Sequence, residues 1–456
     1  MEFDDMPKTN GNPINILVEE FAALSLAQKS AIIYREGLKS EEVISQTVSP
    51  MYQEFKQDSF LTLQKYTQKF EGSFPAKPIL YRDDLEIKYN LVKKENPQII
   101  AAFEEAKLNI EKFHRLQKPQ GFEETINHNK LGFRFQPFDS AALYVPGGKA
   151  LYPSTVLMGL IPAHIAGVKD LTVLTPTLSE TGEPHEVVQA IAYMAGATKI
   201  LAVGGAQAIL AAACGVPNLD ISPVDYIYGP GNIYVAAAKS FVFSKGLCGI
   251  DSFAGPSEVL IIADETANPK YLAHDLMAQA EHDENAISIL LTNNKDIGKK
   301  TIEAINQSLV QRANERNEKR LAITINAIEK NCRVLLFEHI DETIKFSNSF
   351  APEHLEIQTT KNEEILNKIT AAASIFIGDY SPVAMGDYYS GTNHILPTNG
   401  AARFSSGVSV HSFYRRITYQ VCSKQGLKKS LDPITIMSQV EGLYDEHGYS
   451  VKARFD

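Results

Sequence analysis

The chain has 456 residues, of which 44% are hydrophobic and 21% are charged, and its formal net charge is −10. This length suffices for two or more domains with cores of their own. The negative charge argues against nucleic acid as the main partner, because phosphate binding requires clustered Lys and Arg. The apolar runs are too short to span a membrane, and the polar start MEFDDMPKTNGNP is unlike a signal peptide. We therefore expect a cytoplasmic protein with no nucleic-acid or membrane partner.

The chain divides into a helical first part and a longer mixed part. Amphipathic segments such as PQIIAAFEEAKLNIEKFHRLQ predict helices from about residue 17 to residue 120. Short apolar runs then alternate with helix-length segments: AALYVPGG, DLTVLTPT, KILAVGG, VDYIYGPGN, EVLIIAD, ISILLTN, RVLLFEH and ASIFIGD. Continuous apolarity indicates strands buried on both faces, and the alternation indicates parallel βαβ units. Because the runs are too many for one compact sheet, we expect two α/β sheets.

The last part of the chain has a different texture. HILPTNGAARFSSGVSVHSFYRR is punctuated by Gly, Ser and Pro, and a final helix follows it. Asp432 as N-cap and Pro433 at the first helical position predict where that helix starts. We interpret this part as a small tail domain.

Three glycine turns follow predicted strands, at Tyr144–Ala150, Val203–Ile209 and Ile227–Lys239. Each places free backbone N–H groups at the start of a helix, where a phosphate can bind. None has the GxGxxG spacing, and a single turn of this kind is more often a plain connection. Three of them at strand ends favour a nucleotide crevice.

Other stretches carry side chains suited to a metal or to proton transfer. In DLMAQAEHDE, the i, i+3 spacing of Gln279 and His282 puts both on one helix face, yet favourable contacts at a helix C-terminus are the more common explanation of such a pair. Glu353 and His354 form a carboxylate–imidazole pair suited to proton relay, although an exposed pair at a helix start is as common. For Ser257, the spacing does not separate a loop hydrogen bond from a substrate contact. The loop GDYYSGTNHILPT, which includes Asp387 and His394, suits a site better than a linker.

Eight motifs occur in the order found in the histidinol dehydrogenase family, which the chain resembles from about residue 20 to its C-terminus. They are YVPGG, GGAQAI, GPGN, AGPSEV, DLMAQAEHD, APEHLEI, GDYYSGTNHILPT and EGLYDEHGYSVKAR. The resemblance implies a zinc-dependent oxidation of L-histidinol through L-histidinal to L-histidine, with reduction of two NAD, as the last steps of histidine biosynthesis.

The resemblance also implies which residues form the site. One zinc ion per subunit would be held by Gln279, His282, Asp387 and His447. His354 would act as the base, and Glu353 would activate the water that hydrates the aldehyde. These six residues would also contact the substrate, together with Ser257, His394 and Glu441. NAD would contact Tyr144, Gln207 and Asn232.

The resemblance further implies a homodimer in which Glu441 and His447 of each tail complete the partner's site. In the family the tail glutamate precedes the tail histidine by five residues, whereas Glu441 precedes His447 by six. Glu446 is therefore an alternative to Glu441.

The expected fold class is α/β, with two incomplete Rossmann-like parallel-sheet domains, a helical N-terminal region and a small C-terminal tail domain. We expect an N-terminal arm at 1–19, a substrate and metal domain at 20–143 and 258–395, an NAD domain at 144–257, and an exchanged tail at 396–456. Two other functions stay open: a non-catalytic metal- or nucleotide-binding relative, and a zinc hydrolase that uses a bound water. NAD-linked oxidation of histidinol would exclude both.

Overall fold

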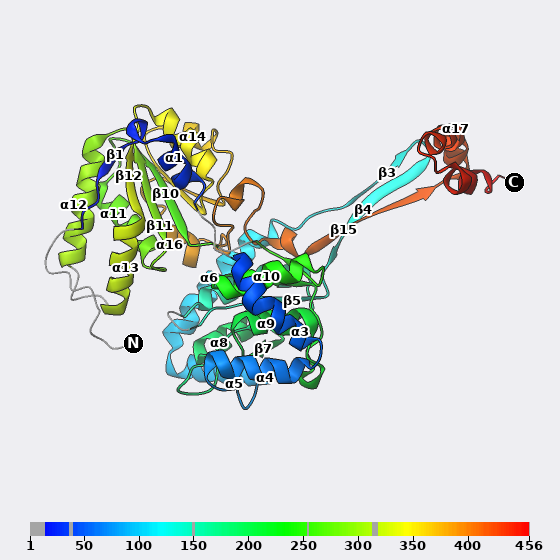
Figure 1. Ribbon diagram of the computed structural model, residues 1–456, viewed down its shortest axis with the longest axis horizontal. Coiled ribbons are helices and arrows are strands. Elements are labelled where there is room, and N and C mark those ends of the chain that lie inside the picture. The colour runs from blue at the N-terminus through cyan, green and yellow to red at the C-terminus, as the bar shows by residue number, and fades with distance from the viewer. Residues whose placement is uncertain (1–13, 36–39, 148–150, 253–254, 312–317, 456) are drawn as a thin grey trace.

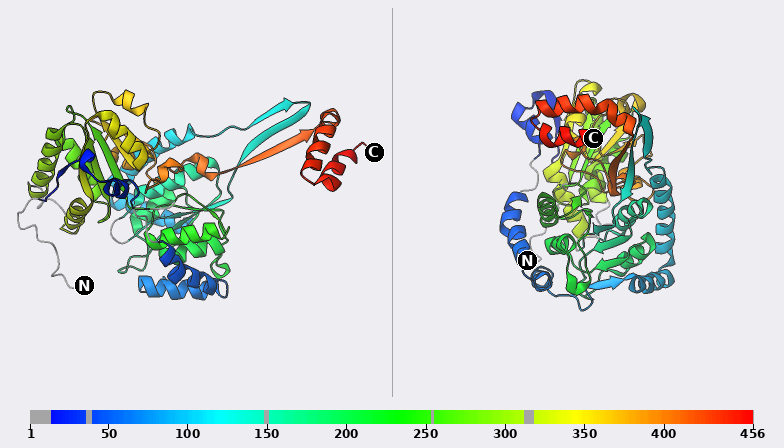
Figure 2. Two further views of the ribbon diagram at one scale, coloured as in Figure 1. Left: turned by 45° about the horizontal axis from the view of Figure 1, so that its top comes forward. Right: turned by 90° about the vertical axis from the view of Figure 1, so that its right-hand side faces the viewer.

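The computed structural model describes residues 14–35, 40–147, 151–252, 255–311 and 318–455. It contains two α/β domains and a long arm that projects away from both of them (Figures 1 and 2). The expected N-terminal arm lies for the most part outside the described residues, since its first 13 positions are not among them.

The first domain is built on a six-stranded parallel sheet, which we call sheet A. Its strands, in spatial order, are β1 (Val18–Glu20), β12 (Cys332–Leu336), β11 (Ile287–Thr292), β10 (Glu258–Ala263), β13 (His354–Gln358) and β14 (Ser374–Ile377). The first strand of the chain, β1, therefore lies at an edge of this sheet.

The second domain is built on another six-stranded sheet, sheet B. Its spatial order is β2 (Ile79–Tyr81), β7 (Lys199–Leu201), β6 (Asp170–Leu174), β5 (Ser140–Tyr144), β8 (Tyr226–Tyr228) and β9 (Gly249–Ile250). All neighbours are parallel except β2, which runs antiparallel to β7 at the edge. The expected α/β class with two Rossmann-like parallel sheets is confirmed.

Helices cover both faces of sheet A, as the apolarity of its strands predicts. Val259 and Ile261 of β10 pack with α11, α12 and α13, whereas Leu260 and Ile262 pack with α1 and α14 on the other face. The helices of this domain are α1 (Leu26–Ile33), α11 (Pro269–Ala280), α12 (Lys295–Gln311), α13 (Glu318–Asn331), α14 (Ile340–Phe350), α15 (Asn362–Leu366) and α16 (Val383–Tyr388).

Sheet B is covered in the same way. Leu143 of β5 belongs to the core formed with α5–α8, and the next residue, Tyr144, belongs to the core formed with α3, α4, α9 and α10. The helices of this domain are α2 (Ser40–Val43), α3 (Ser49–Phe55), α4 (Ser59–Glu71), α5 (Arg82–Glu95), α6 (Pro97–Arg115), α7 (Pro153–Ala166), α8 (Glu186–Ala195), α9 (Gly205–Cys214) and α10 (Ile233–Ser244).

The arm is a three-stranded antiparallel sheet with helices at its tip (Figure 1). Its central strand β4 (Asn129–Pro137) pairs with β3 (Phe122–Ile126) on one side and with β15 (Tyr414–Cys422) on the other. Helices α17 (Lys424–Val440) and α18 (Tyr449–Lys452) follow, joined by a single π turn, η7 (Tyr444–Gly448). The tail is thus joined by strand pairing to a hairpin from the first third of the chain.

The structure corrects the expected assignment of residues 20–143 to the domain of residues 258–395. Strands β2 and β5 belong to sheet B, and helices α3–α6 pack on that sheet. Among the described residues of this range, the end of β1, the 3-10 turn Phe21–Ala23 and α1 belong to sheet A and the elements that cover it. An amphipathic pattern shows that a helix covers an apolar surface, but it does not show which sheet provides that surface.

The start of the last long helix also differs from the expectation. Helix α17 begins after Ser423, whose side chain accepts a hydrogen bond from the backbone N–H of Gly426, and Pro433 lies inside the helix. Ser423 satisfies an amide of the first turn, as an N-cap does, so Asp432 is an interior residue of α17. None of the described helices has the combination of length and apolar character that a membrane crossing requires.

The turn between β8 and α10 depends on Gly229. Gly229 has φ +107°, and a Cβ there would lie 2.4 Å from the carbonyl oxygen of Tyr144; Gly72 has φ +87° with nothing within 4 Å of its Cβ position. Both Ala substitutions impose left-handed strain of about 1–2 kcal/mol. Gly229→Ala adds overpacking of about 1–3 kcal/mol, so its Tm in thermal unfolding should fall clearly below that of Gly72→Ala. Equal Tm values would contradict this account.

Candidate active site

Helix α11 presents the first two expected site residues at its C-terminal end. Asn268 caps the helix through the backbone N–H of Lys270, and Leu272 and Leu276 bury the same stripe that Gln279 continues. Gln279 is 2% exposed, and neither polar atom of its amide has a hydrogen-bond partner among the described residues. His282 follows just after the helix and is half-buried. Burial of an amide without hydrogen-bond partners costs free energy, which indicates that a ligand supplies the missing partners.

Glu353 and His354 lie where β13 begins, in the interior of sheet A. Both are buried, and the Oε2 atom of Glu353 lies 3.5 Å from Nδ1 of His354. Nδ1 also lies 3.0 Å from the carbonyl oxygen of Glu258, so this nitrogen donates and carries the proton. Nε2 is buried and has no hydrogen-bond partner in the described part of the chain. The imidazole is therefore set to accept a proton at Nε2.

Asp387 and His394 approach this imidazole from α16 and from the loop after it. The Oδ1 atom of Asp387 lies 3.8 Å from Nε2 of His354. Nδ1 of His394 lies 2.9 Å from the carbonyl oxygen of Asp387, and Nε2 of His394 lies 3.0 Å from Oγ1 of Thr155. Because Thr155 belongs to α7 of the sheet B domain, this loop joins the two domains at the site.

The two sheets contribute opposite edges. Residues Glu353 and His354 stand at the amino ends of the parallel strands of sheet A. Thr155 stands in the first turn of α7, which follows the carboxyl end of β5 in sheet B. Ligands of open α/β sheets usually bind at carboxyl ends, and in this site only sheet B follows that rule.

Burial controls the charge of these side chains. It lowers the pKa of His354 to about 3 and that of His394 to about 4, and it also lowers the pKa of His282. It raises the pKa of Asp387 to about 7 and that of Glu353 well above its ordinary value. Removal from water penalises every charged form, so the site favours neutral imidazoles and basic carboxylates.

The three glycine turns lie at the carboxyl edge of sheet B, after β5, β7 and β8, although residues 148–150 of the first turn lie outside the described residues. Two expected NAD contacts meet at the second turn. The Tyr144 hydroxyl accepts from the backbone N–H of Gly205, and the Gln207 amide donates to Glu71, which also accepts from Gly204. The free N–H groups that the sequence predicts here are thus partly satisfied within the chain.

The third expected NAD contact, Asn232, is exposed and caps α10 by accepting from the backbone N–H of Tyr234 and Val235. Its turn is held by a buried ion pair between Lys239 and Asp251. Lys239 donates to the carbonyl oxygen of Gly229, and Asp251 accepts from the N–H of the same glycine. The ion pair therefore holds Gly229 through both its N–H and its carbonyl oxygen, which fixes the turn.

The remaining expected residues are placed differently. Ser257 is half-buried next to the start of β10, and its carbonyl oxygen accepts from Ile287. Glu441, Glu446 and His447 are exposed at the tip of the arm, which Figures 1 and 2 show projecting from the domains. A single copy of the chain therefore does not bring His447 to Gln279.

The extra residue between Glu441 and His447 has a structural counterpart. His447 lies in η7, a π turn in which the N–H of Tyr449 donates to the carbonyl oxygen of Tyr444. A π turn contains one more residue per hydrogen bond than an α turn, so it absorbs an insertion locally.

Three residues of one chain fit part of the zinc set implied by the resemblance. Gln279 has an unpartnered buried amide, Asp387 is a buried carboxylate, and His282 is half-buried and close enough to His354 to affect its pKa. Carboxylate, imidazole and amide groups are chemically competent zinc ligands, although amides are unusual. No group of three or more His, Cys, Asp or Glu side chains that could hold a metal occurs in the described ranges. The set is incomplete without a residue from elsewhere.

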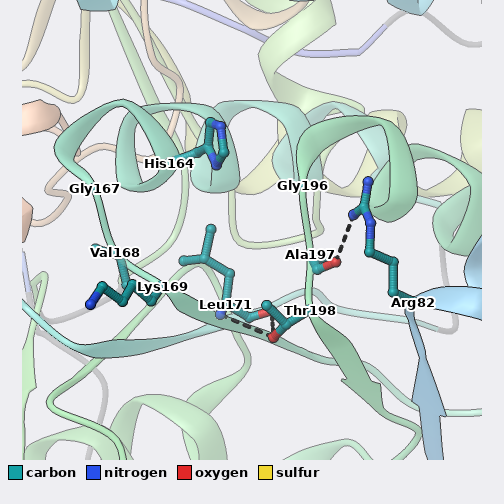
Figure 3. A pocket seen from close by; sticks show the side chains of 9 residues that line it. All are labelled: Arg82, His164, Gly167, Val168, Lys169, Leu171, Gly196, Ala197 and Thr198. Carbon is teal, nitrogen blue, oxygen red and sulfur yellow. Dashed lines mark hydrogen bonds between the residues drawn. The ribbon is translucent and has the colours of Figure 1, made fainter.

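A surface cavity of about 480 Å³ lies away from all these residues (Figure 3). It is lined at the amino ends of β6 and β7 by Arg82, His164, Gly167, Val168, Lys169, Leu171, Gly196, Ala197 and Thr198. Arg82 donates to the carbonyl oxygen of Ala197 beyond the end of α8. Basic side chains near the C-termini of α7 and α8 stabilise those helix ends, which explains the charge of this cavity without a ligand.

Four residues that hold the site together are not among those predicted from the sequence. Glu258, Arg35, Thr155 and Glu71 all contact candidate site residues or their supports. A signal existed for Glu258, because it is the one charged residue of the apolar strand EVLIIA, and a buried charge requires a partner. The partner itself, Arg35, is 223 residues away in the chain and carries no local signal.

Comparisons with known proteins agree on one family. The family model described as histidinol dehydrogenase matches residues 34–455. A histidinol dehydrogenase of Leptospira interrogans is 43% identical over 92% of this chain and 94% of its own length, and one of Methanothermobacter thermautotrophicus is 43% identical over 86% and 89%. The crystal structure of histidinol dehydrogenase from Elizabethkingia anophelis matches with a TM-score of 0.86 and 36% identity, over 97% of this chain and 98% of the other. The chain therefore belongs to the histidinol dehydrogenase family of oxidoreductases.

Proposed function

We propose that this chain oxidises L-histidinol through L-histidinal to L-histidine in histidine biosynthesis, with zinc in the site and NAD as the oxidant. Family membership supports the reaction. The observation that carries the proposal is the state of His354, whose Nδ1 is committed to a main-chain carbonyl while Nε2 is buried and unpaired beside Asp387. That arrangement suits a base that removes a proton from an alcohol.

The reaction balances as two oxidations with one hydration between them. The alcohol loses a hydride and a proton to give the aldehyde, the aldehyde adds water to give a gem-diol, and the diol loses a second hydride and a proton to give the acid. When bound, zinc would hold the nitrogens of the substrate and NAD would accept each hydride. We assign the zinc ligands to Gln279, His282, Asp387 and His447 of the partner subunit.

His354 takes the hydroxyl proton in both oxidations. Its imidazole is neutral, because burial lowers its pKa to about 3, and its free electron pair is on Nε2. Once protonated, the ring has the carboxylates of Glu353 and Asp387 at 3.5 Å and 3.8 Å. In their ionised forms, these two groups stabilise the imidazolium while it exists.

Glu353 activates the water that hydrates the aldehyde. Burial raises the pKa of this carboxyl group well above its ordinary value, so the carboxylate is a stronger base than one in water. One of its oxygens is fixed by the backbone N–H of Glu258, 2.7 Å away. A fixed and basic carboxylate beside the imidazole suits the removal of a proton from water.

The arm supports the proposed homodimer. Its side chains Phe122, Ile126, Val421, Ile436, Met437 and Val440 are between 48% and 84% exposed. Apolar surface of this extent on a projecting element favours contact with another protein surface, and His447 at the tip is the ligand missing from the core of a single chain. A second copy of the chain supplies both the cover and the ligand.

The function is tested by mixing the protein with L-histidinol and NAD and following NADH by absorbance. We expect two NADH for each L-histidinol consumed, because the aldehyde is oxidised in turn. Dialysis against a chelator should stop the reaction, and added zinc should restore it. No NADH from zinc-loaded protein would instead favour a non-catalytic relative.

Substitutions of the reactive pair should separate the two steps. His354→Asn should slow both oxidations by about a hundredfold to ten-thousandfold, because each needs the same proton acceptor. Glu353→Gln should slow oxidation of added L-histidinal more than the first oxidation, measured in a single turnover. Both variants should keep their zinc in metal analysis. Loss of metal from His354→Asn, or equal slowing of both steps by Glu353→Gln, would contradict the assigned roles.

Exchange of the arms predicts complementation between two inactive variants. His354→Asn spoils the core of a site and His447→Ala spoils the tail, so each homodimer has no intact site. Co-expression gives mixed dimers in which the intact core meets the intact tail at one site, so random assembly should restore about a quarter of the wild-type activity. Purified mixed dimers without activity would show that core and tail act within one chain.

A further inference from the structure

The reactive side chains Glu353 and His354 are both anchored on the main chain of one neighbouring residue, Glu258. The backbone N–H of Glu258 donates to Oε2 of Glu353 at 2.7 Å, and its carbonyl oxygen accepts from Nδ1 of His354 at 3.0 Å. Glu258 stands at the very start of β10, just before Val259 pairs with His354. The position of this one residue therefore orients both groups.

The side chain of Glu258 is fixed by Arg35, from the segment after α1. Nε and Nη2 of Arg35 donate to the two carboxylate oxygens at 2.6 Å and 2.5 Å, a bidentate pair. The carboxylate also accepts from the backbone N–H of Asn399 at 3.2 Å. The side chain of Glu258 is 0% exposed and that of Arg35 is 9% exposed, so solvent does not compete for these bonds.

Arg35 also contacts the segment that leads into the reactive pair. Its Nη1 donates at 2.8 Å to the carbonyl oxygen of Phe350, four residues before His354, and its guanidinium stacks 3.5 Å from the centre of the Phe350 ring. A fourth hydrogen bond, to the carbonyl oxygen of Ile33, fixes the guanidinium to its own segment. Arg35 thus joins the start of β10 to the start of the loop that carries Glu353.

We infer that Arg35 is a positioning residue for the proposed oxidation, which sets the orientation of Glu353 and His354 by clamping Glu258 and Phe350 together. This inference rests on the proposed function of the site. The hydrogen bonds of Arg35 within the described part of the chain reach neither reactive side chain, so it acts through Glu258 and the carbonyl of Phe350.

Stability alone does not explain this ion pair. Apolar residues of similar size often replace a buried ion pair without loss of stability. The guanidinium differs from an apolar side chain because its planar fork fixes the orientation of two segments at once. Burial raises the pKa of Glu258, and the ion pair with Arg35 opposes that rise. Loss of Arg35 would therefore also favour the neutral form of this carboxyl group, which accepts weaker hydrogen bonds.

Arg35→Lys tests the inference, because Lys keeps the charge and loses the fork. We expect kcat to fall by up to about a hundredfold from a misplaced base, with L-histidinol and with L-histidinal, while zinc content and KM stay near wild type. Arg333→Lys is the control. Nη1 of Arg333 donates to both carboxylate oxygens of Glu19 at 3.0 Å and 3.1 Å, and this partly exposed pair lies at the β12–β1 edge of sheet A. This variant should keep the wild-type kcat.

The double variant Arg35→Met, Glu258→Leu separates positioning from stability and serves if Arg35→Lys folds poorly. It replaces the ion pair with an apolar contact, so Tm should return to near the wild-type value while kcat stays low. Recovery of kcat together with Tm would overturn the inference, as would an unchanged kcat in Arg35→Lys. Failure of the proposed function has a different signature, because the wild-type protein itself would then form no NADH.

Discussion

The site depends on two hydrogen bonds made by the main chain of Glu258, one to the carboxylate of Glu353 and one from the imidazole of His354. The second bond assigns the proton to Nδ1 and leaves Nε2 free, which makes the ring a base rather than a buried structural histidine. Since Glu258 belongs to a central strand of sheet A, the whole packed domain holds these two bonds in place. The chemistry proposed for the site follows from the protonation state that this contact imposes.

The second constraint is that the site forms between opposite edges of two sheets. Sheet A contributes the amino ends of its strands, with the C-terminal end of α11 beside them, and sheet B contributes the turns at its carboxyl edge. The loop that carries His394 crosses from one domain to the other, where Asn393 donates to the carbonyl oxygen of Met158 in α7. Acid–base groups and glycine turns can therefore face each other although they belong to separate cores.

Much of the fold could be predicted from the sequence. Eight of its strands are continuously apolar, so each can be recognised as a buried strand without knowledge of its contacts with distant residues. Strand β13 was missed, since HLEIQ has polar residues that are buried only because they form the site and its support. The arm strands were missed as well, because they are largely exposed and are stabilised by pairing with residues far away in the chain. For the site, the motifs identified Gln279 and His354, but the partners Arg35 and Thr155 follow only from the tertiary structure.

The strand order of the arm has a consequence for biogenesis. Strand β4 is central, yet its neighbour β15 is made more than 270 residues later, after both domains have been synthesised. Until residue 422 has emerged from the ribosome, the β3–β4 hairpin has an unpaired edge, which is a template for mispairing with other chains. The hairpin of a nascent chain must therefore avoid pairing with other chains. Subunits can associate through complete arms only after translation has nearly ended.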